Sequence, residues 1–252
     1  MGFGAAGQAN RAAAGVILNG MHNARAKPQF PPVEAAGPDG VLLVGGSLAP
    51  DWMLEAYRRG IFPMPIRVER RRHNAWLSPD PRGVLELDGM HISRRLARRL
   101  VRHEFQFTFD RSFAAVVEGC AAPRGRDDDC WLTVALQNAY LALHELGYAH
   151  SIEVWKNGQL VGGVFGVAVG GLFAGESMFH RATDASKAGL AVLLAHLRRQ
   201  GYTLFDVQWT NAHTRSLGAI DLPRAEYLSR LAAALAQDVE FLPGARRPVS
   251  AD

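Results

Sequence analysis

The sequence predicts an α/β (α+β) protein, with a small N-terminal α/β domain and a larger C-terminal domain built on a mixed, largely antiparallel sheet. Apolar runs that alternate with polar residues predict strands, and segments with an apolar stripe at helical spacing lie between them. Asn157-Gly158 separates two apolar runs, which is typical of a β-hairpin. The chain of 252 residues is long enough to bury a large core, and no stretch of about 18 apolar residues predicts a membrane-spanning helix.

The chain divides into four expected parts. Residues 1–38 are rich in Ala, Gly, Asn and Pro without periodicity, which predicts a disordered extension. Residues 39–78 are expected to form the small domain, residues 79–242 the second domain and residues 243–252 a tail. The small domain is expected to contain a strand over Val41–Val44, a helix over Pro50–Arg59, an apolar loop over Ile61–Pro65 and a charged loop over residues 67–74.

The second domain follows the turn-rich segment Trp76–Arg82. We expect strands at Gly83–Leu87, Phe105–Phe109, Ser151–Lys156, Gln159–Val169, Leu172–Glu176 and Tyr202–Trp209. We expect helices at His91–His103, from a cap at Asp110 to about Gly119, and at Thr133–Leu146, Ser186–Gln200 and Pro223–Ala236. This order is similar to that of the acyl-CoA N-acyltransferases, which have a hairpin system followed by strand and helix.

The similarity does not extend to the acyl carrier. In that fold, backbone N–H groups of a basic, Gly-rich loop before the helix bind the CoA pyrophosphate. The corresponding residues 180–187 contain no glycine and include Asp184. The sequence therefore favours an acyl group that arrives on a carrier other than CoA.

Positive charge is concentrated in one part of the chain. Residues 58–102 hold twelve Arg and four acidic residues, a net charge of +8, whereas the rest of the chain carries −4. One face of the helix expected at His91–His103 carries five arginines, namely Arg94, Arg95, Arg98, Arg99 and Arg102. Like charges so close together are unfavourable, so either a phosphodiester backbone neutralises this face or solvent does.

Other function classes lack their motifs. The histidines have no metal-ligand spacing, no P-loop is present, and Gly175–Phe179 lacks the last glycine of a serine-hydrolase elbow. Cys120 and Cys130 are too few for a disulfide framework, which favours free thiols and a cytoplasmic protein. We expect no metal, no cofactor and no membrane partner.

Polar residues at two strand ends indicate chemistry. Glu176 lies in an apolar, Gly-rich setting, where a carboxylate is either paired structurally or binds an amine. Asp206 and Gln208 are two residues apart on a strand and so share a face, where they need each other or a ligand.

With these residues in view, the sequence resembles the bacterial leucyl/phenylalanyl-tRNA–protein transferases over about Gly40 to Val239. The matching stretches are Ala56–Pro63, Trp76–Arg82, His91–Ser93, His144–Gly147, His150–Trp155, Gly175–Phe179 and Ser216–Ala219. The resemblance implies transfer of Leu or Phe from aminoacyl-tRNA to the α-amino group of proteins that begin with Arg or Lys, which marks them for degradation. It also implies a C-terminal domain like the acyl-CoA N-acyltransferases.

The resemblance assigns roles to named residues. Asp206 and Gln208 become the catalytic pair, and Glu176 binds an amine of the donor or of the acceptor. A Gln amide is too weak a base to take a proton, so we expect Gln208 to position the amine or to donate to the oxyanion while Asp206 orients it. Asn211 is expected to support the adenosine or the peptide, and the arginine face to bind the tRNA. The pocket for the Leu or Phe side chain is expected to include Met64, Trp131, Val164, Met178, Leu190 and Leu193.

Three departures from the family pattern stand at Ser47, Met64 and Cys130, where the family commonly has Asp, Trp and Thr. A flexible thioether at position 64 favours looser selection among Leu, Phe and Met. The acidic run Asp127–Asp129 is expected to be an exposed loop or to attract a basic acceptor. Two alternative functions stay open: a CoA-dependent N-acyltransferase of the same fold, and a non-catalytic tRNA-binding protein.

Overall fold

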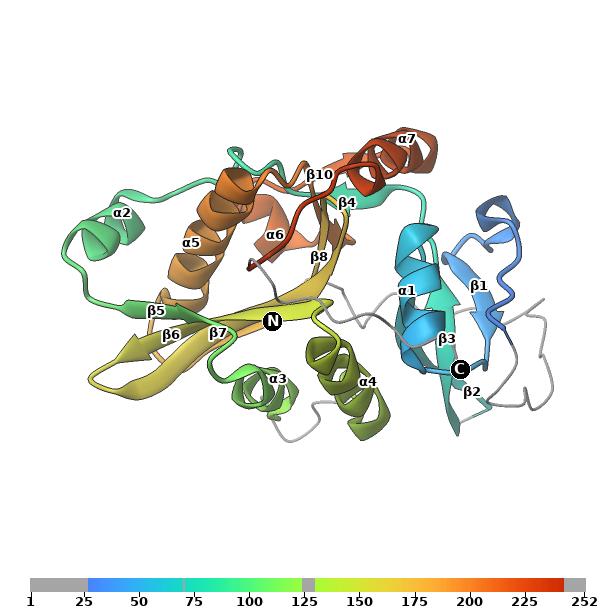
Figure 1. Ribbon diagram of the computed structural model, residues 1–252, viewed down its shortest axis with the longest axis horizontal. Helices are drawn as coiled ribbons and strands as arrows, with labels where there is room; N and C mark the ends of the chain where they lie inside the picture. The colour runs from blue at the N-terminus through green and yellow to red at the C-terminus, as the bar shows by residue number, and fades with distance from the viewer. Residues whose placement is uncertain (1–26, 70, 124–129, 243–252) are drawn as a thin grey trace.

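The computed structural model of the protein describes residues 27–69, 71–123 and 130–242. It contains a three-stranded sheet formed by the first three strands of the described chain and a seven-stranded sheet that carries most of the helices (Figure 1). The mixed α/β fold class is therefore confirmed. The boundaries drawn at residues 38, 78 and 242 stay predictions, and the tail at 243–252 lies outside the described residues.

The small sheet has the antiparallel order β1-β3-β2. Its strands are β1 (Val41–Val44), β2 (Phe62–Val68) and β3 (Arg71–Leu77), and helix α1 (Pro50–Arg58) connects the first two. The loops expected at 61–65 and 67–74 were wrong, because Phe62–Val68 and Arg71–Leu77 pair as the β2–β3 hairpin. The two prolines in β2 favoured a loop over a strand in the sequence. Because β2 lies at the sheet edge, residues without an N–H are tolerated there.

The disorder expected up to residue 38 was wrong for residues 27–38. A short 3₁₀ helix, η1, covers Val33–Ala35, and Phe30 packs edge-on against Trp52 and Trp76, with ring centroids 5.3 and 5.0 Å apart. The Arg59 guanidinium also donates to the Phe30 carbonyl oxygen at 2.9 Å. The composition of this segment did not predict its order, because the order depends on the burial of a single aromatic residue, Phe30.

The large sheet has the order β10-β4-β9-β8-β7-β6-β5, in which only β8 and β9 are parallel neighbours among the described strands. Its strands are β4 (Arg82–Val84), β5 (Gln106–Phe109), β6 (Ala149–Lys156), β7 (Gln159–Val169), β8 (Leu172–His180), β9 (Leu204–Gln208) and β10 (Ile220–Leu222). The expected hairpin at Asn157-Gly158 is confirmed. Strand β8 runs four residues further than expected, and β4 is shorter than expected.

Helix α5 covers one face of this sheet, and α3 and α4 cover the other (Figure 1). The helices of this part are α2 (Arg94–Val101), α3 (Phe113–Ala121), α4 (Val134–Glu145), α5 (Ala185–Gln200), α6 (Ala212–Ser216) and α7 (Arg224–Leu235). No pattern in the sequence predicted the short elements α6 and β10. The expected cap at Asp110 was wrong, since α3 starts after Ser112 and the Asp110 carboxylate bonds instead to His150 at 2.7 Å.

Two large apolar cores and two smaller ones result among the described residues. One large core extends from the small sheet and α1 through α3 and α4 to the near face of the large sheet, and the other lies between the far face and α5. The small sheet is thus packed against the large one by a continuous core, which fixes α1 beside β8.

Candidate active site

Glu176 lies in a β-bulge of β8. Its neighbours Gly175 and Ser177 pair with consecutive residues of β7, so Glu176 has no partner in the ladder. Its side chain is 4% exposed. The Tyr57 hydroxyl on α1 donates to Oε1 at 2.8 Å, and the Tyr140 hydroxyl on α4 donates to Oε2 at 2.7 Å. The carboxylate is therefore held from two helices.

Burial raises the pKa of Glu176 from 4.5 to about 7. Hydrogen bonds from Tyr140 and Tyr57 oppose this rise, the charge of Asp206 adds to it, and the charge of Arg82 opposes it. Burial and the neighbouring Glu176 raise the pKa of both tyrosines above the ordinary value, so they stay protonated donors. A carboxyl group that titrates near pH 7 in a cleft is a good candidate for a functional group.

Gln208 ends β9 with a left-handed backbone, φ +61°. Its side-chain Nε2 donates to Glu176 Oε1 at 3.4 Å, which brings two predicted site residues together. The strand opposite approaches closely, because a Cβ on Gly83 would lie 2.8 Å from the carbonyl carbon of Trp209. Only glycine fits at that position beside the turn.

The spacing of Asp206 and Gln208 predicts a shared face on which they need each other or a ligand, and the structure links them through the Gln208 backbone. A bulge interrupts the β4–β9 pairing between them, and Gln208 has a left-handed backbone. Asp206 is fully buried, and its Oδ1 accepts the backbone N–H of Gln208 at 2.8 Å. It therefore holds the backbone of Gln208 and leaves the amide side chain to Glu176.

Arg82 completes this network. Its Nε and Nη2 donate to the two oxygens of Asp206 at 3.0 and 2.6 Å, and its Nη1 donates to the Gly60 carbonyl oxygen at 2.8 Å. The Tyr227 hydroxyl donates to Asp206 Oδ2 at 2.9 Å. Although burial disfavours the charged form, the charge of Asp206 raises the pKa of Arg82 above its ordinary value.

A small hollow opens where the two sheets meet. Its lining residues are Phe62, Pro63, Met64, Trp131, Glu176 and Gln208. Two expected pocket residues, Met64 and Trp131, thus lie beside the Glu176 carboxylate and the Gln208 amide.

The other expected pocket residues lie elsewhere. Val164, Leu190 and Leu193 have no exposed surface and pack with Met178 in the core under α5. Met178 also lines a separate pocket of about 240 Å³, together with His180, Thr183, Asp184, Ser186, Lys187 and His213. The structure therefore divides the expected apolar pocket between the two faces of the sheet.

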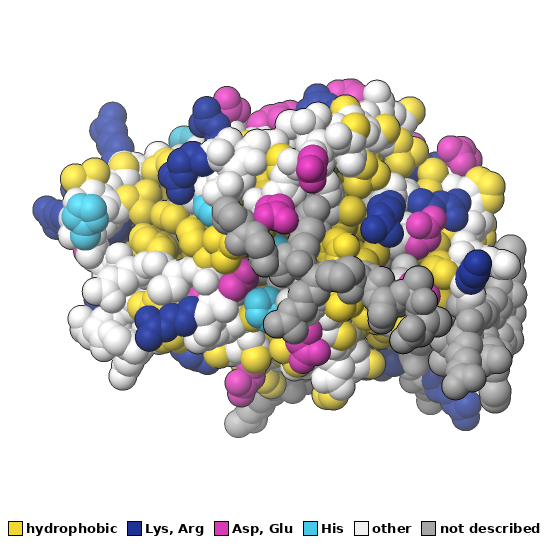
Figure 2. All heavy atoms as spheres, viewed as in Figure 1, with side chains coloured by type: hydrophobic (Ala, Val, Ile, Leu, Met, Phe, Trp, Pro, Cys, Tyr) yellow, Lys and Arg dark blue, Asp and Glu magenta, His cyan; other side chains and the backbone are white. Residues whose placement is uncertain are grey.

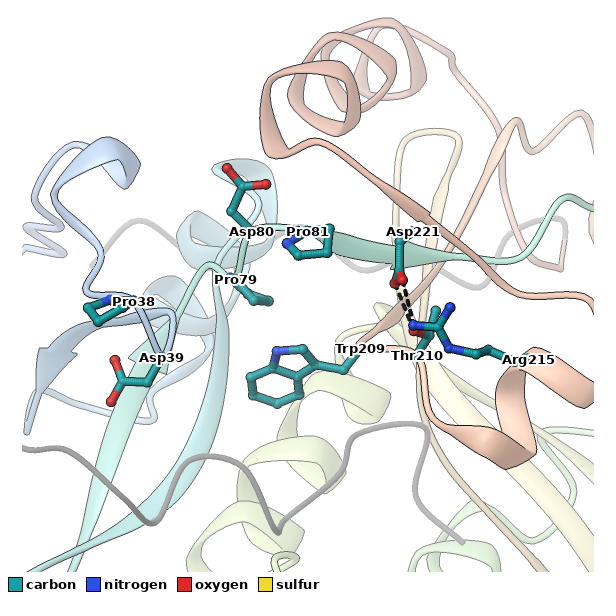
Figure 3. Close-up of a pocket in the computed structure, with 9 residues that line it drawn as sticks. All are labelled: Pro38, Asp39, Pro79, Asp80, Pro81, Trp209, Thr210, Arg215 and Asp221. Carbon is teal, nitrogen blue, oxygen red and sulfur yellow. Dashed lines mark hydrogen bonds and ion pairs between the residues drawn. The ribbon is translucent and has the colours of Figure 1, made fainter.

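A larger pocket of about 510 Å³ adjoins the end of β9 (Figure 3). Trp209 and Thr210, which directly follow Gln208, lie at its centre, and its other residues are Pro38, Asp39, Pro79, Asp80, Pro81, Arg215 and Asp221. The Trp209 ring also meets Phe62 edge-on, with centroids 5.0 Å apart. Trp209, which lines this pocket, therefore contacts a residue that lines the hollow.

Asn211 has a local structural role that the sequence did not reveal. Its Oδ1 accepts the backbone N–H of Thr214 at 2.9 Å, and the Thr214 hydroxyl accepts the backbone N–H of Asn211 at 2.8 Å. This capping box starts α6. The side-chain carbonyl of Asn211 is thus occupied by the helix it begins.

The five arginines, four in α2 and Arg102 at its C-cap, differ in their contacts. Arg94, Arg95, Arg98 and Arg102 are exposed, and Arg99 is partly buried. Arg95 and Arg99 lie 2.8 and 3.4 Å from the Asp184 carboxylate at the start of α5. Figure 2 shows Lys and Arg side chains at the end of the molecule that carries α2 and also toward the opposite end.

Several members of the network have no signal in the sequence. Tyr57 and Arg82 lie in stretches that match the family pattern, yet nothing in their spacing connects them to Glu176 or Asp206. Tyr140 and Tyr227 read as ordinary apolar positions of helices. Asp127–Asp129 lie outside the described residues, so the structure says nothing about that run.

The described residues contain no group of three or more His, Cys, Asp or Glu side chains placed to hold a metal ion. None of their helices is both long and apolar enough to cross a membrane.

Comparison with known proteins gives matches over most of the chain. Residues 84–232 match the family model of the leucyl/phenylalanyl-tRNA protein transferases, and residues 46–80 match the model of the N-terminal domain of the same family. A leucyl/phenylalanyl-tRNA–protein transferase from Stutzerimonas stutzeri (strain A1501) is 49% identical over 205 residues, which are 81% of this chain and 89% of that protein. One from Aromatoleum aromaticum is 50% identical over 208 residues, 82% of this chain and 86% of that protein.

Solved structures resemble the chain only distantly. A GCN5-related N-acetyltransferase from Kribbella flavida is 11% identical, with a TM-score of 0.34 over 66% of this chain and 57% of that chain. A likeness at this level supports no argument about function.

Proposed function

Because this chain belongs to the family of the leucyl/phenylalanyl-tRNA protein transferases, we propose that it transfers Leu or Phe from aminoacyl-tRNA to the α-amino group of proteins that begin with Arg or Lys. The observation that carries this proposal is the contact between Glu176 and Gln208 in the hollow, with Asp206 behind it. The modified proteins become substrates for degradation. Since aminoacyl-tRNAs are made and used in the cytoplasm, we place the reaction there.

The chemistry requires little beyond positioning. An aminoacyl ester is already activated, so attack by a neutral amine needs no nucleotide and no metal. The new C–N bond forms as the carbonyl becomes a tetrahedral oxyanion, and the ester C–O bond then breaks to release the ribose hydroxyl. The Gln208 amide N–H can donate to that oxyanion, which is the role that a fixed amide performs best. The proton of the attacking amine passes to the departing ribose oxygen.

Glu176 suits the recognition of the donor's free α-amino group. Its two carboxylate oxygens are fixed by Tyr57 and Tyr140, so an ammonium group can bind to them without a rearrangement of the Glu176 side chain. With a pKa of about 7, the carboxyl group of Glu176 is only partly ionised at neutral pH and becomes fully charged above it. The aminoacyl group would then lie across Gln208, beside Met64 and Trp131.

The tRNA body is assigned to α2. Arg94, Arg98 and Arg102 present charge to solvent, and phosphate contacts from such a helix give affinity without base readout. Arg95 and Arg99 are less available because Asp184 already pairs with them.

The acceptor chain is assigned to the pocket beside Trp209. It adjoins Gln208, and Asp39 and Asp80 stand at its edge. Their carboxylates accept only backbone N–H groups in the described part of the chain, from Val41 at 3.2 Å and Arg224 at 3.1 Å. Negative charge at this edge favours a basic first residue.

A transfer assay tests the proposal. Purified protein is mixed with radiolabelled Leu-tRNA, Phe-tRNA or Met-tRNA and a peptide that begins with Arg. The same peptide with an acetylated N-terminus is the control, and we expect label only on the free amine. Label from acetyl-CoA without label from any tRNA would support the CoA-dependent alternative, and tRNA binding without transfer would support the non-catalytic one.

A further inference from the structure

Arg82 is a charged residue with almost no exposed surface, at 1%. A buried guanidinium is costly unless its donors are satisfied and its charge is paired. Here three of its nitrogens donate to Asp206 and Gly60, and its plane lies over the Phe62 and Tyr227 rings at 4.7 and 4.5 Å. Every contact fixes one position for this side chain.

These contacts lead to both sides of the reaction hollow. On one side, Asp206 accepts from Arg82 and from the backbone N–H of Gln208, so it holds the left-handed turn that aims the Gln208 amide. On the other side, Arg82 lies against Phe62, which lines the hollow. Arg82 itself does not line it.

A second link runs to the helix that carries Tyr57. Gly60, which accepts from Arg82, follows directly after α1, and the Tyr57 hydroxyl donates to Glu176. The Arg82 guanidinium thus connects β9, which carries Gln208, with the segment after α1, the helix that carries Tyr57.

We infer that Arg82 is a positioning residue for aminoacyl transfer, which sets the Gln208 amide against Glu176 by joining the small sheet to β9. This inference rests on the proposed function. Arg82 touches no reacting atom, and it acts through Asp206 on one side and through Phe62 and Gly60 on the other.

The charge of Arg82 has an additional effect on the site. The groups that face Glu176 are Tyr57 on α1, Tyr140 on α4, Asp206 on β9 and Arg82 on β4. Asp206 raises the pKa of Glu176 and Arg82 lowers it. A neutral residue at position 82 would leave Asp206 uncompensated, so the carboxylate of Glu176 would form only at a higher pH.

The test uses the full chain with Phe-tRNA and an Arg-initiated peptide. Arg82→Lys keeps the charge and loses the fork that grips both oxygens of Asp206. We expect kcat to fall roughly 10- to 100-fold, as for a reacting group displaced by about 1 Å, with KM for Phe-tRNA within about twofold. Arg224→Lys is the matched control, because Arg224 also links the two parts of the chain, through the Ser78 carbonyl oxygen at 2.9 Å, but does not touch Asp206. Its kcat should stay near that of the wild type.

A double-mutant cycle with Gln208→Ala separates positioning from general damage. If Arg82 acts through Gln208, the variant that combines Arg82→Lys with Gln208→Ala is no slower than Gln208→Ala alone. Multiplicative losses, or equal losses in Arg82→Lys and Arg224→Lys, overturn the inference.

A pH profile provides an independent readout. Arg82→Met should move the midpoint of the rise in kcat/KM to a higher pH, and an unmoved midpoint contradicts the inference. If Arg82→Lys does not fold, Tyr227→Phe takes its place in the double-mutant cycle, since it removes one hydrogen bond to Asp206 and leaves Arg82 in place. If the wild-type protein transfers from neither Leu-tRNA nor Phe-tRNA, the proposed function itself is refuted. A failure of the Arg82 variants alone, with an active wild type, bears only on the role of Arg82.

Discussion

The pH dependence of folding tests the buried carboxyl group directly. The pKa of Glu176 rises from 4.5 to about 7 on folding, mainly because the group is buried. The folded state therefore binds a proton that the unfolded state releases between these pH values. The resulting stabilisation is fully present below pH 4.5 and is lost as the pH rises through about 7.

The size of the effect follows from the shift. One pKa unit corresponds to about 1.4 kcal/mol, so the contribution of Glu176 falls by roughly 2 to 3 kcal/mol between about pH 5 and pH 8. Glu176→Gln should remove this part of the pH dependence while keeping an amide that Tyr57 and Tyr140 can reach. Urea unfolding of both proteins at the two pH values measures it, and Glu118→Gln on the exposed side of α3 is the matched control.

The difference in unfolding free energy between wild type and Glu176→Gln must change with pH. A difference that is the same at both pH values would refute the reasoning, because some other group would then carry the titration. A pH dependence altered equally by Glu118→Gln would refute it as well.

Three further outcomes are expected. Gln208→Ala should lower kcat by about 10²- to 10³-fold, the usual loss of one oxyanion donor, with tRNA affinity unchanged in a filter-binding assay. Asp206→Ala should in addition lower the unfolding free energy by about 3 to 5 kcal/mol, since it leaves a buried guanidinium unpaired, and denaturant titration would show this. Met64→Trp should narrow the choice of donor, measured as a smaller kcat/KM for Met-tRNA relative to Phe-tRNA, and an unchanged ratio would remove position 64 from donor selection.

Local patterns accounted for most elements of the large domain. The hairpin at Asn157-Gly158 and the helices α4, α5 and α7 follow from turn residues and from the spacing of apolar residues, which act over short distances along the chain. The β2–β3 hairpin did not follow, because prolines and a run of arginines mark loops more often than edge strands. Phe30 also escaped prediction, since its burial depends on two tryptophans that are distant in sequence.

The site was predictable only in part for the same reason. Glu176 and Gln208 stood out as polar residues at strand ends, but their supports come from far along the chain. The bond from Tyr57 to Glu176 spans 119 residues, and the bond from Arg82 to Asp206 spans 124. Val164 and Leu190 show a related difficulty, because an apolar side chain reads the same whether it lines a pocket or fills a core.

The pairing of Asp184 with Arg95 and Arg99 lowers the number of arginines that contribute to the salt dependence of tRNA binding. When an arginine that faces water binds a phosphate of the tRNA, the counterions of that phosphate are released to the solution. Asp184 is an anion fixed in the protein, so a phosphate that displaces it sets no ion free. The slope of log affinity against log salt should then reflect about three charges on α2 and not five, which is roughly −2 to −3. Removing Asp184 should make that slope steeper, although it adds no positive charge to the protein.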